Sequence, residues 1–179
     1  GVFACGPDCG QHNSLQIPDK NLGLVLKMLG MASTVEAELA GRLVENALED
    51  CVSAFDGFGR EILRIHAKKS SDPAKAEKVS FQNLDSANQN VSGLFSFELK
   101  AGLSSGEWNT AIRGFQKRHL LSHKMGVVDI DYLRKSGDTH AVVGRKIDIG
   151  AGEVQELALR VGKLAQHLSD MLQKLEKKS

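Results

Sequence analysis

The stretch KRHLLSHKMGVVD, residues 117–129, places one arginine and two histidines within six consecutive positions. A histidine side chain can accept or release a proton near neutral pH. An arginine guanidinium can hold a phosphate through two parallel hydrogen bonds and can stabilise charge that develops in a transition state. Arg118, His119 and His123 therefore have the chemistry to act on a phosphate-bearing substrate.

The spacing of Arg118 and His123, Arg-x4-His, is not selective by itself. With four to six intervening residues allowed, the chain matches at several other places, for example from Arg60 to His66 and from Arg134 to His140. Two features favour the first pair. A polar residue directly follows the arginine, and lysines on both sides form a local basic cluster where we expect a helix to end.

The longer segment GEWNTAIRGFQKRHLLSHKMGVVDIDYLRKSGD, residues 106–138, resembles part of the HEPN domains, an all-helical family named for nucleotide binding in higher eukaryotes and prokaryotes. The hallmark of that family is an arginine, a polar residue, three further residues and a histidine, which the run from Arg118 to His123 matches. The glycine, aspartate and tyrosine of GVVDIDYL also look like bacterial members. Outside this segment the helical pattern extends the resemblance loosely from Thr34 to the C-terminus.

The resemblance implies a metal-independent endoribonuclease of toxin or defence type, which works as a homodimer in the cytoplasm and needs no cofactor. His123 would transfer the proton, Arg118 would bind the scissile phosphate, and His119 would position one of the other two. The RNA 2′-hydroxyl would be the nucleophile and a 2′,3′-cyclic phosphate the product. We expect the flanking Lys117 and Lys124 to contact RNA.

The alternative is a non-catalytic helical module that dimerises or binds RNA or protein, with the motif as a solvated helix end. Cationic residues near a helix C-terminus are stabilised by the helix dipole by roughly 0.3–1 kcal/mol each. Helix geometry adds one expectation of its own. Residues five apart lie about 140° apart around the axis, so Arg118 and His123 should splay, while His119 and His123 share a face. A site assembled from two chains would fit that geometry.

Metal binding is the weaker alternative at two places. His119 and His123 have the spacing of half a metal site, but no third ligand is evident. Cys5, Cys9 and His12 have ligand-type side chains in a spacing that no standard zinc knuckle shows. They are either the remaining half of a zinc ribbon or a terminus without metal. We interpret the third cysteine, Cys51, as a core residue, and His66 and His167 as surface residues on helix flanks.

Apolar spacing predicts an all-α protein, an antiparallel bundle of four to five helices with at most a small strand pair near 141–149. We expect an irregular N-terminal segment, 1–17, as the remnant of an upstream module, followed by the helical domain, 18–179. The expected helices cover a short stretch from Pro18 that Gly30 ends or weakens, then 34–68, 81–95, and one that leads into the motif until Gly126. A further helical turn is expected over 129–134. Capping boxes, Ser33 with Glu36 and Ser104 with Glu107, predict where two helices begin.

A strict heptad pattern marks the last helix, which we expect to begin near Gly152. Its apolar residues are spaced alternately three and four apart, and they are Val154, Leu157, Val161, Leu164, Leu168, Met171 and Leu175. This seam predicts packing along another helix, either in the same chain or in a partner. Dimerisation through it is the core of the non-catalytic alternative.

Composition is ordinary for a globular protein of 179 residues, with 41% hydrophobic and 25% charged residues. The 23 basic and 22 acidic residues give a formal net charge of +1, so no overall field attracts nucleic acid or membranes. No apolar run is long enough to span a membrane. Three cysteines define no disulfide framework, which favours a reducing compartment.

Overall fold

The computed structural model describes residues 7–176, with side chains described from Asp19 onward. These residues form seven α-helices and two short 3-10 helices, and none of them belongs to a β-strand. The all-α prediction is confirmed. Three of the helices are long, namely α1 (Pro7–Ala32), α2 (Ala37–His66) and α7 (Ala151–Glu176).

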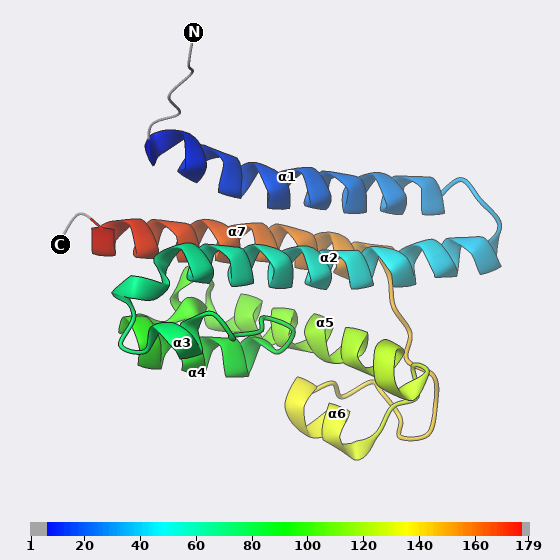
Figure 1. Ribbon diagram of the computed structural model, residues 1–179. Coiled ribbons are helices and arrows are strands. Elements are labelled where there is room, and N and C mark those ends of the chain that lie inside the picture. The colour runs from blue at the N-terminus through cyan, green and yellow to red at the C-terminus, as the bar shows by residue number, and fades with distance from the viewer. Residues whose placement is uncertain (1–6, 177–179) are drawn as a thin grey trace, which may run out of the picture.

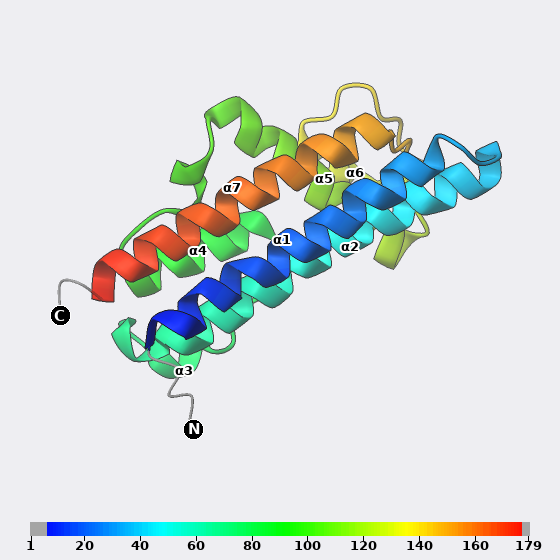
Figure 2. The same ribbon diagram turned by 90° about the horizontal axis from the view of Figure 1, so that it is seen from above.

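The three long helices run side by side in both views of the molecule (Figures 1 and 2). α1 and α2 form an antiparallel hairpin, and α7 runs in the same direction as α2 (Figure 1). The shorter helices lie on the side of α2 and α7 that faces away from α1. They are α3 (Pro73–Ala76), α4 (Leu84–Phe95), α5 (Ser105–Lys124) and α6 (Ile130–Ser136), with the 3-10 helices η1 (Ala67–Lys69) and η2 (Leu99–Gly102) between them.

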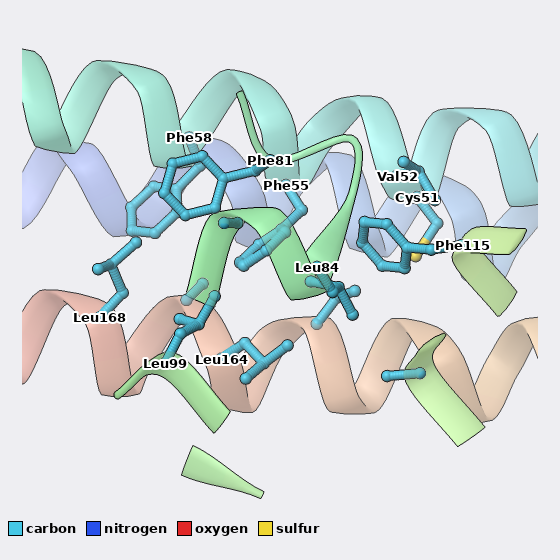
Figure 3. Packing of buried hydrophobic residues seen from close by; sticks show 14 of the residues in the cluster. Cys51, Val52, Phe55, Phe58, Phe81, Leu84, Leu99, Phe115, Leu164 and Leu168 are labelled. Atoms are coloured by element: carbon cyan, nitrogen blue, oxygen red, sulfur yellow. The ribbon is translucent and has the colours of Figure 1, made fainter. Parts of the chain in front are cut away.

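The main core lies between α2, α7 and the segment that includes α4 and α5 (Figure 3). Phe55 of α2 meets Phe81 and Phe115 edge to face, with ring centroids 5.4 Å and 6.2 Å away. A Cβ at Gly59 would overlap the Phe81 ring, so only glycine lets this ring pack directly on α2. Cys51 is fully buried, as expected for a core residue, and burial raises the pKa of its thiol to about 12.

The heptad seam of α7 is used inside the chain. Val154, Leu157, Val161, Leu164 and Leu168 are all buried, and α7 contacts α1, α2 and α5. Dimerisation through residues 154–175 is therefore wrong as a prediction, because the seam already has intramolecular partners. Of the two kinds of packing predicted for the seam, the one within the same chain is found; binding of RNA or protein by a non-catalytic module does not depend on the seam.

The N-terminal prediction also needs correction. The segment 1–17 was expected to be irregular, but α1 begins at Pro7 and continues past Gly30 to Ala32, so residues 7–17 are helical. Residues 1–6 lie outside the described part of the chain. Because α1 extends this far, Ser33 lies at its end, and the Ser33 hydroxyl donates to the Gly30 carbonyl oxygen at 2.7 Å. The capping box predicted there is absent, and Glu36 caps α2 instead by accepting from the Leu39 N–H.

Both histidines that were expected on the surface contribute to packing. His66 is 4% exposed, with Nδ1 2.9 Å from the Ile62 carbonyl oxygen and Nε2 3.3 Å from a Glu176 carboxylate oxygen. His167 is half-buried, and its Nε2 lies 3.0 Å from the Glu98 carbonyl oxygen. Helical spacing could not identify the burial of either side chain, because Glu176 and Glu98 come from distant segments of the chain.

A small lobe formed by the end of α5, α6 and the following loop has its own apolar cluster of Leu120, Val128 and Tyr132. Its only strand-like pairing among the described residues is one antiparallel bridge between Val127 and Lys146, so the predicted strand pair is reduced to that bridge. Among the described residues, no helix combines the length and the apolar character that crossing a membrane requires.

Candidate functional site

α5 carries the motif, and its first turn is built as the sequence predicts. The Ser104 hydroxyl accepts from the Glu107 N–H at 3.3 Å, and the Glu107 carboxylate accepts from the Ser104 N–H at 3.0 Å. Hydrogen bonds from Lys163 and Ser104 lower the pKa of the Glu107 carboxyl to about 2. The helix ends at Lys124, followed by Met125 and Gly126 with φ of 52° and 76°. Two successive left-handed residues end α5 directly after the motif, close to the predicted position.

A pocket of about 310 Å³ lies beside the C-terminal half of α5. It lies between α5, the chain around Gln82 and the first turns of α4, with Lys135 of α6 at one side. Arg118, His119 and His123 all line it. The three residues that the sequence singled out therefore meet at one surface feature of a single chain.

The two histidines lie side by side on the exposed face of α5. Their ring centroids are 4.7 Å apart with an interplanar angle of 46°, which confirms the shared face expected from their four-residue spacing. Partial burial lowers the pKa of His119, and the nearby His123, Lys135 and Arg118 lower it further, against a smaller opposite effect of Asp129. His119 is therefore neutral at pH 7 and can accept a proton there.

Arg118 enters the pocket from the buried side of α5. Arg118 is 9% exposed, and its Nη1 donates to the Gln82 side-chain oxygen at 3.3 Å. No other hydrogen bond of its guanidinium is present among the described residues, and Nε is enclosed without a partner. A guanidinium has five N–H donors, so most of its capacity is unused by the protein.

Gln82 is itself held by α2. The buried carboxylate of Asp56 accepts from the Phe81 N–H at 2.6 Å and from the Ser80 hydroxyl at 3.0 Å. The Gln82 amide nitrogen is 3.5 Å from the other Asp56 oxygen. Asp56 thus fixes the segment 80–82 and, with it, the side chain that contacts Arg118. No local pattern in the sequence links Asp56 or Gln82 with the motif.

The splaying expected for Arg118 and His123 does not separate them. Both side chains line the same pocket, since the long arginine side chain reaches toward Gln82 while His123 stands at the helix end. One chain is enough to bring the three side chains together, so the need for a second chain does not follow from helix geometry.

Lys117 is not available to RNA, and this expectation was wrong. Its side chain is buried, and Nζ lies 2.7 Å from the Asp148 carbonyl oxygen and 2.7 Å and 2.9 Å from the two Glu153 carboxylate oxygens. Lys124, by contrast, is exposed, with Nζ 4.0 Å from an Asp129 oxygen. Lys135, which no pattern had singled out, lines the pocket in place of Lys117.

In the pairs from Arg60 to His66 and from Arg134 to His140, side chains are engaged in contacts within the protein. Arg60 lies 3.7 Å from Asp56 in an ion pair, whereas His66 is enclosed near Glu176. Arg134 pairs with Asp131 one turn earlier at 2.7 Å. The structure therefore distinguishes Arg118 and His123 from these two pairs, which spacing alone could not reject.

The described residues contain no group of three or more histidine, cysteine, aspartate or glutamate side chains placed to hold a metal ion. Cys5, Cys9 and His12, the weak metal alternative, have side chains outside the described part of the chain.

Comparison with known proteins gives no relative: no family model, no curated protein and no solved structure matches this chain.

Proposed function

We propose that this chain is a HEPN-like domain that acts as a metal-independent endoribonuclease. One observation carries the proposal. Arg118, with most of its donors unused, lines the same pocket as two adjacent and exposed histidines, His119 and His123. Phosphodiester cleavage by an internal hydroxyl requires a group that donates hydrogen bonds to the phosphate, next to groups that transfer protons. Arg118 and the two histidines have these properties. The resemblance of residues 106–138 to HEPN domains supports the same reaction.

In the proposed reaction the RNA 2′-oxygen attacks the adjacent phosphorus, and the bond from phosphorus to the 5′-oxygen breaks. His123 accepts the 2′-hydroxyl proton as base and then donates it as acid to the departing 5′-oxygen, so the proton balance closes on one imidazole. The products are a 2′,3′-cyclic phosphate and a 5′-hydroxyl. His119, in its neutral form, positions His123 or Arg118. Arg118 stabilises the charge on the phosphate oxygens.

The proposal includes a homodimer. Next to the site, the turn after α5 exposes three apolar side chains, Met125, Val127 and Ile130, and Ile130 is 70% exposed. A second copy that covers this turn and part of α5 would enclose the histidine pair and limit access of water. Sedimentation at tens of micromolar should show the dimer, and Ile130→Asp should give monomer. A monomeric wild type would contradict this part.

The test of the reaction is cleavage of a labelled single-stranded RNA in the presence of EDTA, with product ends analysed for cyclic phosphate. His123→Ala should lower the rate by about 10²–10⁴-fold, the usual contribution of a positioned proton-transfer group. His140→Ala is the matched control, since His140 is exposed and lies outside the pocket. An inactive wild type, or cleavage that survives His123→Ala, would refute the proposed function.

A further inference from the structure

Gln116 is a polar residue of the pocket that is nearly buried and has no hydrogen-bond partner for its side chain among the described residues. It lies two positions before Arg118 on α5, is 8% exposed, and lines the same pocket as the arginine and the two histidines. Its side chain makes no hydrogen bond among the described residues, yet its amide atoms are not enclosed by protein. Because these amide atoms are reachable from the pocket and unpaired by protein, a ligand in the pocket can use both their donors and their acceptor. The amide is therefore placed to bind something that enters the pocket.

The neighbouring wall adds two more amides with capacity left. Asn83 uses its oxygen to accept from the Ser86 N–H at 3.0 Å, which leaves its nitrogen without a partner there. Asn90 uses its nitrogen to donate to the Ser86 carbonyl oxygen at 2.9 Å, which leaves its oxygen unused. Asn83, which caps α4, and Asn90 within it line the same pocket as Gln116, so this wall has a donor and an acceptor that the protein leaves unused.

The chemistry of this wall differs from that of a second phosphate site. Phosphate oxygens only accept hydrogen bonds, so a phosphate would leave the amide oxygens of Gln116 and Asn90 unpaired. The edge of a nucleobase presents a donor beside an acceptor, which a glutamine amide can meet with two hydrogen bonds. The cations Arg118 and Lys135 on the same pocket favour a ligand that also carries phosphate. The pocket volume of about 310 Å³ lies in the range of small-ligand sites.

We infer that the amide wall binds the edge of a nucleobase next to the phosphate held by Arg118, and that Gln116 is the residue that discriminates between bases. This rests on the proposed ribonuclease function, which by itself requires no base preference. The cleaved RNA is then single-stranded at the site, because a base in a duplex has its edge already paired.

The experiment is cleavage of a single-stranded RNA library randomised around one position, with cut sites counted by sequencing. The wild type should prefer one base next to the cut. Gln116→Met keeps the side-chain length but removes the donor and acceptor, so it should reduce the preference by roughly 5- to 150-fold, the discrimination of one two-bond amide–base pair. Gln155→Met, on the exposed face of α7, is the matched control and should cut like the wild type. Thermal unfolding should show that Gln116→Met is folded.

A second measurement separates this inference from the reaction itself. Binding of labelled homopolymeric oligonucleotides of A, C, G and U is compared for the wild type and Gln116→Met. If the wild type does not cut but binds one base best through Gln116, the reaction is refuted and the base site stands. A uniform loss over all four bases would assign Gln116 to the sugar or backbone and overturn the inference. An unchanged base profile in Gln116→Met, or no base preference in the wild type by either measurement, would also overturn it.

Discussion

Lys117 and Arg118 are neighbours on α5 and both are buried, yet their surroundings are opposite. Lys117 points toward the start of α7, where Asp148 and Glu153 take its Nζ in three contacts. Arg118 points toward the 80–82 segment, where the described residues offer its guanidinium only the Gln82 oxygen. One cation is satisfied by the protein, and the other has donors to spare.

This difference shows how a buried charge can be assigned a role. Burying a cation is costly unless it is paired, so a paired one is explained by stability alone. A cation with unused donors at the wall of a pocket calls for a ligand instead. The adjacent histidines, which lie on the exposed side of the same helix, share the pocket of Arg118 and not the surroundings of Lys117.

Among the variants that test the comparison of Lys117 with Arg118, the largest effect is expected for Arg118. Arg118→Lys should lower the rate of RNA cleavage by about 10²–10³-fold, because a compact ammonium cannot replace a planar two-bond donor at a charged transition state. The thermal unfolding midpoint should change little. Arg134→Lys, in an exposed ion pair with Asp131, is the control and should cut normally. Near-normal cleavage by Arg118→Lys would remove Arg118 from the site and erase the contrast with Lys117.

Lys117→Met should lower the stability of the fold but leave RNA binding unchanged. Glu153 and the Asp148 carbonyl lose their partner, so the free energy of unfolding should fall by about 1–3 kcal/mol, less than for a fully buried pair because Glu153 is 41% exposed. Urea unfolding measures this. RNA affinity, measured by anisotropy in a His123→Ala background, should stay the same.

Lys124→Met is the matched partner of that variant. Because Lys124 is exposed, its substitution should leave the free energy of unfolding within about 0.5 kcal/mol of the wild-type value. Its loss should weaken RNA binding modestly and reduce the dependence of affinity on salt. If Lys117→Met weakens RNA binding more than Lys124→Met, the division of α5 into a structural and a ligand-facing side is wrong.

The start of α5 offers a smaller effect. Ser104→Ala should lower the free energy of unfolding by about 1 kcal/mol, because the Glu107 N–H loses its capping oxygen. Ser33→Ala should cost only a few tenths of a kcal/mol, since water can replace its exposed bond to the Gly30 carbonyl. Cleavage per folded molecule should be normal in both, as the pocket lies at the other end of α5. Equal costs for the two serines would contradict the observed caps.

The smallest effect concerns His119, whose pKa should lie below the ordinary value of about 6.5 when followed by NMR titration. His123→Ala should raise it more than Lys135→Met does, in the order of their influence. Because folding lowers this pKa, the neutral form is favoured in the native state. The associated stability is complete above about pH 6.5 and is lost as the pH falls below it. A pKa above 6.5 would contradict the crowding of cations at the pocket.

Short-range patterns predicted α5 well. Ser104 and Glu107 mark its beginning, Gly126 lies just past its end, and the four-residue spacing of His119 and His123 correctly placed them on one face. These features depend on atoms within one or two helical turns, so they can be read along the chain. The same pattern failed at Ser33. There the preceding helix continues to Ala32, and the Ser33 hydroxyl donates to the Gly30 carbonyl of that helix instead of capping α2.

The sequence by itself determined the helical class, the heptad seam of α7 and the three residues at the candidate site, since each follows from local spacing and side-chain type. Only the tertiary structure decided which neighbours those side chains meet. Lys117 bonds to Glu153, 36 residues later in the chain, and Arg118 bonds to Gln82, 36 residues earlier. Such contacts depend on how α2, α5 and α7 pack, and no local pattern encodes them. The same packing buried the seam of α7 within the chain and left Gln116 with an open amide beside the histidines.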